Sequence, residues 1–425
     1  MTYEESVKYL YKIAGFAKKS SLEDINYLLE QLGNPHKDLK FVHVAGTNGK
    51  GSVCAFLEAV LKEHGKTTAA FTSPHLVKVN ERIRLNGQDI SDERFKDVCS
   101  RVKECVEAAV EKGVNQPSFF EMMFLMALCI MEEEQPDICL IETGMGGRYD
   151  ATNVIIPEVS VITSISMDHM SFLGNTLAQI AEKKAGIIKD GCRVVTARQK
   201  PEAMQVIERI SREHGAKCTI ADASEAEMLK ESCLGQTIRY RGEEYEIPLA
   251  GVYQKENAVV ALNALKVLDE LGFPTAAEQK KEGLRTVNWN GRFTVICKKP
   301  LFVVDGAHNP AAADMMAASI EHYFKGKRII YIMGVFADKD YRSVIQKTAH
   351  FADRILTIQT PNNIRALPAG ELAKTVSEYN PNVQAMDTIK DAVEEAFSLA
   401  GEQDVIIAFG SLSFIGEMTD IVENL

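Results

Sequence analysis

An apolar, strand-like run that breaks into a glycine-rich turn constrains this chain more than any other feature. Residues 41–52 read FVHVAGTNGKGS, and a helical pattern continues from Val53 to Glu63. Glycines at positions 46, 49 and 51 carry no Cβ atoms, so backbone N–H groups can approach an oxyanion, and the start of the helix directs partial positive charge at the same point. Lys50 adds a full positive charge. The segment therefore predicts a cradle for phosphate groups.

The spacing of this turn differs from the common G-x-x-x-x-G-K-[ST] phosphate loop. Val44 stands where the first glycine belongs, Gly51 occupies the hydroxyl position, and Ser52 follows one residue later. A plain glycine-rich turn between a strand and a helix is the simpler alternative. It is less favoured because strand, helix, lysine and hydroxyl all coincide. The pattern points away from generic P-loop proteins.

Composition indicates a globular chain with more than one domain. The sequence has 425 residues, of which 46% are apolar and 25% are charged. It begins MTYEESVKYLYKIAG, with acidic residues where a secretory leader carries positive charge, and no apolar run approaches the ~18 residues of a membrane span. The apolar segment Phe119 to Met131 contains Glu121 and predicts a buried helix. We therefore expect a cytoplasmic protein with no membrane partner.

Cysteine usage and charge exclude further classes. The nine cysteines form no C-x-x-C pair and no Cys/His cluster at zinc spacing, so neither a disulfide framework nor a structural metal is expected. A net charge of −11 argues against nucleic-acid binding, because binding a duplex requires a basic face that displaces counterions. Any nucleotide that the protein uses is expected to be a free one.

Strand-like runs alternate with helical stretches, which predicts an α/β fold with a mostly parallel sheet. The first series comprises residues 41–45, 67–71, 138–142, 159–164 and 193–196, and a second comprises 294–297, 302–304, 328–333, 354–357 and 405–409. Residues 237–247 predict a hairpin around Gly242, and a helix is expected from about Lys255 to Leu271. The boundary near residues 286–291 divides the chain into domains 1–288 and 289–425. The crevice between two such domains is the expected ligand site.

Two strand ends of the first domain carry side chains that suit a metal ion near phosphate. Glu142 ends one strand and precedes a glycine-rich loop, and the Asp168-His169 pair follows another. Each alone is more simply a surface or capping residue, but their shared position at strand ends favours magnesium held against nucleotide oxygens. Lys183 and Lys184 follow in a helical run. For these two, a solvated surface pair and a functional role both stay open.

At this point the sequence resembles the folylpolyglutamate synthase and dihydrofolate synthase family, within the Mur ligase superfamily of ATP-dependent amide-forming enzymes. The resemblance covers essentially the whole chain. Its motifs are GTNGKGS (46–52), SPHL (73–76), GGRYDATN (147–153), DH (168–169), EKKAGI (182–187) and DGAHNP (305–310). The resemblance implies a P-loop nucleotide-binding domain with a mostly parallel sheet, which holds the folate site, and a smaller Rossmann-like α/β C-terminal domain on the glutamate side.

The family resemblance also implies a nucleotide site. The phosphate loop would comprise Gly46, Thr47, Asn48, Gly49, Lys50, Gly51 and Ser52. Gln254 and Asn257 match the adenine-side segment, although Tyr253 stands where many relatives have histidine. From the second domain Arg292 would reach the terminal phosphate, and Asp305 and His308 would contact the nucleotide or the incoming glutamate. For Asp305 and Gly306, a tight turn after a strand is an equally good explanation.

Metal and folate sites follow from the same resemblance. Magnesium ligands would be Ser52, Ser73, Glu142 and His169, and a carbamylated Lys184 would bind a second magnesium. The pterin end of the substrate would lie against Ser118, Phe120, Asp150 and Ala151. Phe120 is equally well explained as a core residue of an apolar helix.

The implied reaction is phosphorylation of a folate carboxylate by ATP, followed by attack of the L-glutamate amine on the acyl phosphate. Lys50, His169, Lys184 and Arg292 would be the catalytic residues, and dihydropteroate or a reduced folate the acceptor. A cell-wall ligase acting on a muramyl peptide and an ATPase switch that forms no bond are the alternatives. Whether the enzyme is bifunctional, its glutamate chain length and a potassium requirement stay open; a monomer is expected.

Overall fold

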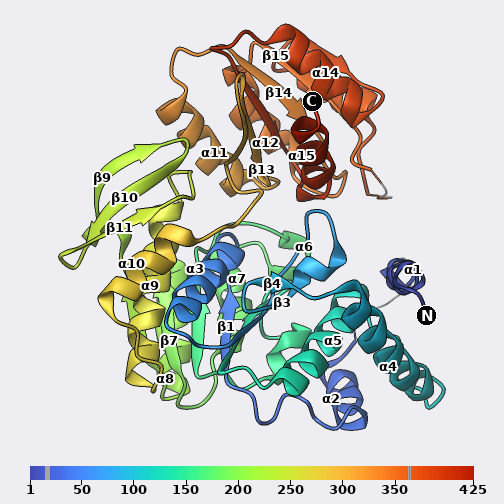
Figure 1. Ribbon diagram of the computed structural model, residues 1–425, viewed down its shortest axis with the longest axis vertical. Helices are drawn as coiled ribbons and strands as arrows, with labels where there is room; N and C mark the ends of the chain where they lie inside the picture. Colours follow the sequence, from blue (N-terminus) through green and yellow to red (C-terminus); the bar gives the residue numbers. More distant parts are fainter. Residues whose placement is uncertain (15–19, 362, 364) are drawn as a thin grey trace. The chain divides into compact units, whose positions relative to one another are not determined.

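The computed structural model describes residues 1–425 except 15–19, 362 and 364 (Figure 1). The chain forms two compact units. The first unit comprises Met1–Ser73, Val79–Ala226 and Glu256–Thr286, and the second comprises Pro74–Lys78, Glu227–Lys255 and Val287–Leu425. The predicted division of roles between residues 1–288 and 289–425 stays a prediction.

An eight-stranded sheet forms the centre of the first unit, in the order β4-β3-β2-β5-β1-β6-β7-β8. Its strands are β1 (Phe41–Ala45), β2 (Thr68–Phe71), β3 (Ile83–Leu85), β4 (Gln88–Asp89), β5 (Ile138–Glu142), β6 (Val159–Ile162), β7 (Arg193–Ala197) and β8 (Lys217–Ala221). The strands from β2 to β8 in this order pair in parallel, whereas β3 and β4 are antiparallel. The carboxyl ends of β1, β5 and β6 therefore lie side by side, which is where open α/β sheets bind ligands.

Helices cover both faces of this sheet, because every residue of β1 and β5 is buried. They are α1 (Tyr3–Ala14), α2 (Leu22–Gln31), α3 (Lys50–Glu63), α4 (Asp92–Val110), α5 (Phe119–Glu134), α6 (Met170–Leu173), α7 (Leu177–Lys184), α8 (Pro201–Glu213), α9 (Gln254–Glu270) and α10 (Ala277–Thr286). Helix α5 is buried from Glu121 to Met131. Its start is fixed by a capping box between Ser118 and Glu121. The predicted buried helix is therefore confirmed.

The second unit contains two sheets. Strands β9 (Glu227–Ser232), β10 (Gly235–Tyr240) and β11 (Glu243–Ile247) form an antiparallel sheet. The other has the order β12-β13-β17-β14-β15-β16, from β12 (Thr294–Lys298), β13 (Leu301–Asp305), β14 (Ile329–Met333), β15 (Arg354–Thr357), β16 (Val383–Ala385) and β17 (Val405–Phe409). Only β12 runs antiparallel in it. The covering helices are α11 (Pro310–Tyr323), α12 (Tyr341–Thr348), α13 (Ala369–Ser377), α14 (Ile389–Leu399) and α15 (Ile415–Glu423).

The predicted fold class is confirmed, and every strand predicted from an apolar run is present. The predicted hairpin is formed by β10 and β11, with Arg241 and Gly242 both at positive φ in the turn (51° and 86°). Strands β3, β4 and β16 were not predicted, because each has at most three residues. Helix α3 begins at Lys50, three residues before the predicted start.

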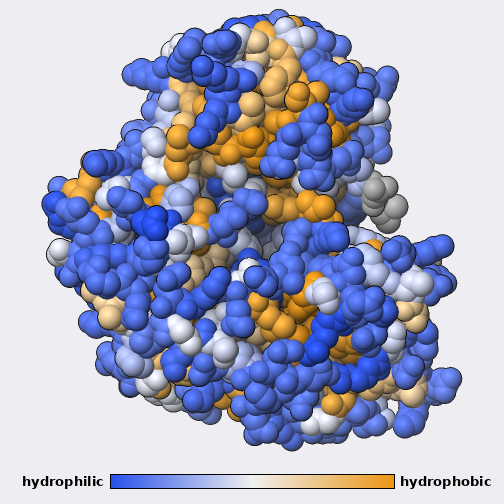
Figure 2. Space-filling model, in the orientation of Figure 1, coloured by the Kyte–Doolittle hydropathy of each residue, from blue (hydrophilic) through white to orange (hydrophobic). Residues whose placement is uncertain are grey.

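Most of the face shown in Figure 2 is hydrophilic, with smaller hydrophobic areas between. Within the described residues, no helix is long and apolar enough to cross a bilayer.

Candidate active site

The end of β6 holds the glycine-rich turn in place. Thr47 donates its backbone N–H to the carbonyl of Ser164 at 2.8 Å. The hydroxyl of Thr163 donates to the carbonyl of Asn48 at 2.6 Å. A Cβ atom on Gly46 would lie only 1.8 Å from this hydroxyl oxygen, so position 46 admits no side chain. The turn is therefore preorganised by a neighbouring strand that lies more than a hundred residues further along the chain.

Asn257, at the start of α9, approaches the same turn. Gly49 is the N-cap of α3 and has φ 86°, a conformation that favours glycine. A Cβ atom there would lie 2.2 Å from Oδ1 of Asn257. Gly51 and Ser52 are buried in the first turn of α3. The structure thus brings Asn257 to the phosphate loop.

Lys50 and Glu142 form an ion pair beside the turn. Lys50 Nζ lies 3.7 Å from Glu142 Oε1 and donates a hydrogen bond of 3.3 Å to the carbonyl of Thr47. The other carboxylate oxygen of Glu142 accepts the backbone N–H of Ser73 at 3.0 Å. Glu142 is only 3% exposed. Three strand ends, those of β1, β2 and β5, therefore converge on one cation and one carboxylate.

Lys184, at the end of α7, lies within the same site. Its Nζ donates a hydrogen bond of 2.6 Å to the carbonyl of Gly46, and the residue is 3% exposed. Burial, reinforced by Lys50, lowers the pKa of Lys184 to about 7, while Asp168 and Asp150 oppose the shift. A solvated surface lysine is therefore wrong for Lys184. Lys183 faces another way, with its Nζ 4.8 Å from the centroid of the Tyr149 ring.

His169 follows the segment that contacts the turn. Ser166 donates its backbone N–H to Thr47 Oγ1 at 3.0 Å, and His169 caps α6 with φ 47°. His169 Nε2 lies 3.9 Å from Asp168 Oδ2. The described part of the chain contains no group of three or more His, Cys, Asp or Glu side chains that could hold a metal ion.

This donor set nevertheless fits magnesium. Magnesium usually keeps several waters and binds one or two carboxylates together with substrate phosphates. One buried carboxylate, Glu142, stands beside Ser73 and the lysine of a phosphate turn. The arrangement suits a magnesium ion that is held partly by a nucleotide rather than by a cage of protein ligands.

Phe120 lies close to the strand end that carries Glu142. Its ring packs on Phe71 at a centroid distance of 5.3 Å, and a Cβ atom on Gly144 would lie 2.8 Å from it. Ser118 instead uses its hydroxyl to accept the backbone N–H of Glu121 at 3.4 Å. The predicted hydroxyl therefore caps α5, whereas the predicted aromatic ring is half-buried beside the Glu142 loop.

Asp150 anchors the glycine-rich loop after β5. Its Oδ2 accepts the backbone N–H of Met145 at 2.8 Å, and its Oδ1 accepts both the hydroxyl (2.6 Å) and the backbone N–H (3.1 Å) of Thr152. Ala151 is buried within the same turn. Because the Thr152 hydroxyl donates its only hydrogen to Asp150, Nε2 of His43, 2.8 Å away, must be its donor. Burial lowers the pKa of His43 to about 3.

Asp305, in the second unit, is surrounded by donors. Its Oδ2 accepts the hydroxyl of Tyr253 at 3.0 Å and the backbone N–H of Phe293 at 2.8 Å, and its Oδ1 accepts the N–H of Ala307 at 2.7 Å. Burial raises the pKa of Asp305, and the Arg292 guanidinium opposes this shift. The structure thus gives Tyr253, whose role the sequence left open, a hydrogen bond to Asp305.

The rest of the DGAHNP segment packs against Arg292. A Cβ atom on Gly306 would lie 2.2 Å from Nη1 of Arg292, so glycine lets the guanidinium approach. His308 donates through Nδ1 to the carbonyl of Gly306 at 2.8 Å. Gln254 is fully buried at the start of α9. The sequence analysis offered a tight turn after the strand or a cluster of site residues as explanations for this segment. The structure contains both, the turn at Asp305 and Gly306 and the cluster of Arg292, Asp305 and His308.

Two residues beside the site were missed by the sequence analysis. His43 lies inside β1, where an isolated histidine gives no signal. Arg82 ends a 3₁₀ helix (Val79–Arg82), and its Cζ lies 4.9 Å from the centroid of the Phe119 ring. Burial lowers the pKa of Arg82 to about 10, against the influence of Tyr11 and Glu142. No phosphate or metal motif includes it.

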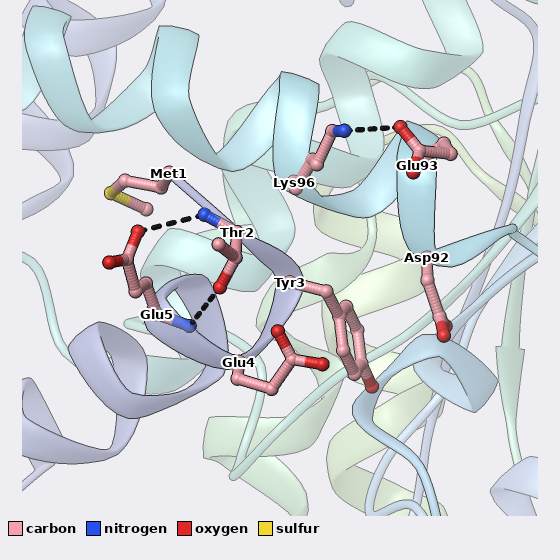
Figure 3. Close-up of a pocket in the computed structure, with 8 residues that line it drawn as sticks. All are labelled: Met1, Thr2, Tyr3, Glu4, Glu5, Asp92, Glu93 and Lys96. Carbon is pink, nitrogen blue, oxygen red and sulfur yellow. Dashed lines mark hydrogen bonds and ion pairs between the residues drawn. The ribbon is translucent and has the colours of Figure 1, made fainter.

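A separate hollow of about 650 Å³ lies between the start of α1 and α4 (Figure 3). Its lining is Met1, Thr2, Tyr3, Glu4, Glu5, Asp92, Glu93 and Lys96. Four carboxylates against one lysine would repel anionic ATP and folate. None of the predicted site residues lines this hollow.

Comparison with known proteins agrees with this geometry. The model of the Mur ligase middle domain matches residues 44–265, and that of the Mur ligase, glutamate ligase domain matches residues 291–412. The chain is 34% identical to the dihydrofolate synthase/folylpolyglutamate synthase of Bacillus subtilis over 98% of both chains. Crystal structures of Mycobacterium tuberculosis folylpolyglutamate synthase with ADP and AMPPCP superpose with a TM-score of 0.90 at 29% identity, covering 99% of both chains. E. coli FolC in complex with DHPP and ADP has a TM-score of 0.88 at 25% identity, covering 100% of this chain and 98% of that one.

A phosphate turn on a parallel sheet, followed by a glutamate ligase domain, defines a Mur-type ligase. Within this superfamily the chain belongs to the dihydrofolate synthase/folylpolyglutamate synthase family. It is an ATP-dependent acid–amino-acid ligase. These relatives support neither a cell-wall ligase nor an ATPase switch.

Proposed function

We propose that this ligase joins L-glutamate to the carboxylate of dihydropteroate, of a reduced folate, or of both, with ATP as the energy source. The observation that carries the proposal is the Lys50–Glu142 ion pair, 3.7 Å long, beside a turn that is shaped for phosphate. The names of the relatives from B. subtilis and M. tuberculosis point to the same acceptors.

In the first step, a carboxylate oxygen of the acceptor attacks the γ-phosphorus of ATP. A new oxygen–phosphorus bond forms, the bond to the β–γ bridging oxygen breaks, and ADP leaves. Both reacting groups are anions, so positive charge must be preorganised around them. Lys50 and the backbone N–H groups of the turn supply this charge in the first unit, and Arg292 is proposed to supply it from the second.

In the second step, the amine of L-glutamate attacks the carbonyl carbon of the acyl phosphate. A tetrahedral intermediate forms and collapses, phosphate leaves, and the amine loses its extra proton to give the amide. Water would hydrolyse the acyl phosphate, so its exclusion from the site favours the amide. We assign Asp305 and His308 to the nucleotide or glutamate side, with Gln254 and Asn257 on the adenine side.

Magnesium would be held by Ser52, Ser73, Glu142 and His169. When bound, it would neutralise phosphate charge during the transfer. The buried carboxylate of Glu142, fixed by the N–H of Ser73, supports this assignment. A potassium requirement is tested by assays with and without that ion.

Lys184 is proposed to be carbamylated. A pKa lowered to about 7 leaves a large share of the amine neutral near neutral pH, and only the neutral amine reacts with carbon dioxide. The carbamate would replace a buried cation with an anion that can bind a second magnesium. The 2.6 Å hydrogen bond from Lys184 Nζ to the Gly46 carbonyl supports a role for this side chain at the phosphate turn.

The pterin end of the acceptor is proposed to lie against Phe120, Asp150 and Ala151. The half-buried ring of Phe120 beside Gly144 supports this placement, because an aromatic ring offers a face for stacking. Ser118 would contribute through its backbone or by defining the start of α5, since its hydroxyl caps the helix.

We propose that one copy of the chain is sufficient for the reaction.

A coupled assay of ADP release tests the proposal. The protein is incubated with ATP and magnesium, and L-glutamate is added with dihydropteroate in one arm and tetrahydrofolate in another. The proposal predicts ADP release that requires glutamate together with at least one acceptor, with an amide product of matching mass. Hydrolysis that is indifferent to both additions would contradict it.

A further inference from the structure

The residue that follows Arg292 has a backbone conformation that a bulky side chain rarely adopts. Phe293 has φ 50°, in the left-handed region, and is 1% exposed. We infer that Tyr253 and Asp305 clamp Phe293 in this conformation. The clamp sets the position of the Arg292 side chain, so Tyr253 is a positioning residue for this arginine. The inference rests on the proposed function, in which Arg292 supplies positive charge to the transferred phosphate.

The pairing of β12 with β13 brings Arg292 to the carboxyl end of β13. The two strands are antiparallel, with Thr294 opposite Val304, so the residues before β12 lie beside those after β13. Gly306 donates its backbone N–H to the carbonyl of Gly291 at 3.0 Å. Strand β13 pairs in parallel with β17, and α/β sheets bind ligands at the carboxyl ends of their parallel strands. The backbone of Arg292 is therefore held at the edge where such a sheet binds its ligand.

Asp305 joins Phe293 to Tyr253. Its Oδ2 accepts the backbone N–H of Phe293 at 2.8 Å and the hydroxyl of Tyr253 at 3.0 Å. Its Oδ1 accepts the N–H of Ala307 at 2.7 Å, which fixes the plane of the carboxylate. Burial and the neighbouring Asp305 raise the pKa of Tyr253, so the hydroxyl keeps the proton that it donates. Three donors thus hold the carboxylate in place, and the carboxylate holds the backbone of Phe293.

The two ends of this clamp are themselves anchored. The ring of Phe293 stacks on that of Phe324 at a centroid distance of 6.0 Å and an interplanar angle of 13°. Val252, which precedes Tyr253, donates its backbone N–H to the hydroxyl of Ser319 in α11 at 3.2 Å. A bulky residue stays left-handed only where its surroundings over-determine that conformation. Loss of the Tyr253 hydroxyl would remove one of these restraints and leave the ring packing unchanged.

The guanidinium group of Arg292 stays close to the backbone that the clamp fixes. Its Nη1 donates to the carbonyl of Gly291 at 3.4 Å, and a Cβ atom on Gly306 would lie only 2.2 Å from it. A cation stabilises a transition state most when it is already in place before the reaction begins. A misplacement of about 1 Å can lower the rate by about 100-fold. Relaxation of the backbone at Phe293 would therefore move the charge and slow phosphate transfer.

A purely structural role of the Tyr253 hydroxyl is the competing explanation. A less stable fold lowers kcat by the same factor whether or not Arg292 is present, so the two losses multiply. A positioning residue acts through Arg292, so its loss has no further effect once Arg292 has been removed. A double-mutant cycle therefore distinguishes the two explanations.

The experiment measures kcat and the KM for the acceptor by glutamate-dependent ADP release. The proteins are the wild type, Tyr253→Phe, Arg292→Ala and the double variant, and the acceptor is whichever of dihydropteroate and tetrahydrofolate reacts faster. Tyr331→Phe is the matched control. It removes a buried tyrosine hydroxyl from the same unit, and this hydroxyl has no hydrogen-bond partner among the described residues. Circular dichroism shows whether each variant is folded.

We expect Arg292→Ala to lower kcat by about 100-fold or more and Tyr253→Phe by about ten-fold, with the KM for the acceptor unchanged in Tyr253→Phe. The double variant should have the kcat of Arg292→Ala alone, and Tyr331→Phe should match the wild type. If Tyr253→Phe does not fold, the same cycle with Asp305→Ala decides, because this change removes the acceptor of the Phe293 N–H. Asp305→Ala should likewise cause no further loss of kcat in the Arg292→Ala background.

Three results would overturn the clamp while leaving the proposed reaction intact: a further loss of kcat in the double variant, a wild-type kcat in Tyr253→Phe, or a change confined to KM. A wild-type kcat in Arg292→Ala would overturn the charge role given to Arg292, and this inference with it. ADP release by the wild-type protein that ignores glutamate and both acceptors would instead overturn the proposed function. The same set of rates therefore separates these failures.

Discussion

The Nζ of Lys184 donates a hydrogen bond of 2.6 Å to the carbonyl oxygen of Gly46, which joins the end of α7 to the first glycine of the phosphate turn. An amine buried to 3% exposure pays a desolvation penalty when charged, which is why its pKa falls to about 7. A lysine in this position is poorly explained by stability alone. We propose that its chemistry, either as a cation or as a carbamate, is directed at the nucleotide phosphates.

Replacing Lys184 by alanine should reduce kcat by about 100-fold or more, because a charged group aimed at the phosphates is lost. If the active form is a carbamate, acetate added to the Lys184→Ala variant should restore part of the activity by supplying the missing oxygens. Steady-state assays with and without acetate measure both effects. Lys183→Ala, which alters the neighbouring half-buried lysine, is the control and should retain near-normal kcat. Normal turnover in Lys184→Ala would contradict the assignment.

Lys50→Ala should abolish glutamate-dependent ADP release while leaving the fold intact. The side chain supplies the cation of the phosphate turn and the partner of Glu142. Activity and circular dichroism measured on the same preparation separate catalysis from folding. Lys62→Ala, in the last turn of the same helix, should behave like the wild type. Near-normal turnover of Lys50→Ala would count against the nucleotide site.

Gly49→Ala should destabilise the protein by more than Gly33→Ala. Both glycines have φ close to 87°, at 86° and 88°, so both substitutions incur the ~1–2 kcal/mol cost of a left-handed alanine. Only at Gly49 would the new methyl group also meet Asn257, at 2.2 Å, whereas nothing lies within 4 Å at Gly33. Urea unfolding of both variants measures the difference. Equal losses would show that Asn257 does not approach the turn as described.

The stability of the protein should fall on mild acidification because of His43. Its folded pKa of about 3 is lower than the ordinary 6.5, so between these values the unfolded chain binds a proton that the folded chain does not. Each pH unit below 6.5 then costs about 1.4 kcal/mol of unfolding free energy. His43→Gln keeps a donor for Thr152 but cannot titrate, so it should show a shallower loss between pH 6.5 and 5. His350→Gln, at an exposed position, should keep the wild-type slope.

Much of the site could be predicted because its residues sit at strand ends. Glu142 and the turn after β1 follow buried apolar runs, and parallel strands bring their carboxyl ends to one edge of the sheet. The position of a residue at the end of an apolar run was therefore enough to predict which distant residues lie beside it at the edge of the sheet. This reasoning did not identify Lys184 as a site residue. The periodicity of α7 shows which side of the helix is apolar, but it does not show that a lysine at the end of the helix turns inward and donates to a carbonyl.

Other features depend on tertiary contacts that no local pattern encodes. His43 reads as an ordinary strand residue until Thr152 and Asp150 are placed beside it. Tyr253 gained a partner only when Asp305, in a distant segment, packed against it. Arg82 ends the 3₁₀ helix that leads into β3, and the position of this helix depends on the pairing of β2 with β3, which was itself too short to predict.

Transfer of a labelled oxygen tests the central claim most directly. Dihydropteroate or tetrahydrofolate is prepared with heavy oxygen in its carboxylate and converted with ATP, magnesium and L-glutamate, and the inorganic phosphate released is analysed by mass spectrometry. An acyl phosphate leaves one carboxylate oxygen on phosphorus, so one heavy atom should appear in each phosphate formed with an amide. Amide formation with unlabelled phosphate would contradict activation of the carboxylate at the Lys50 turn.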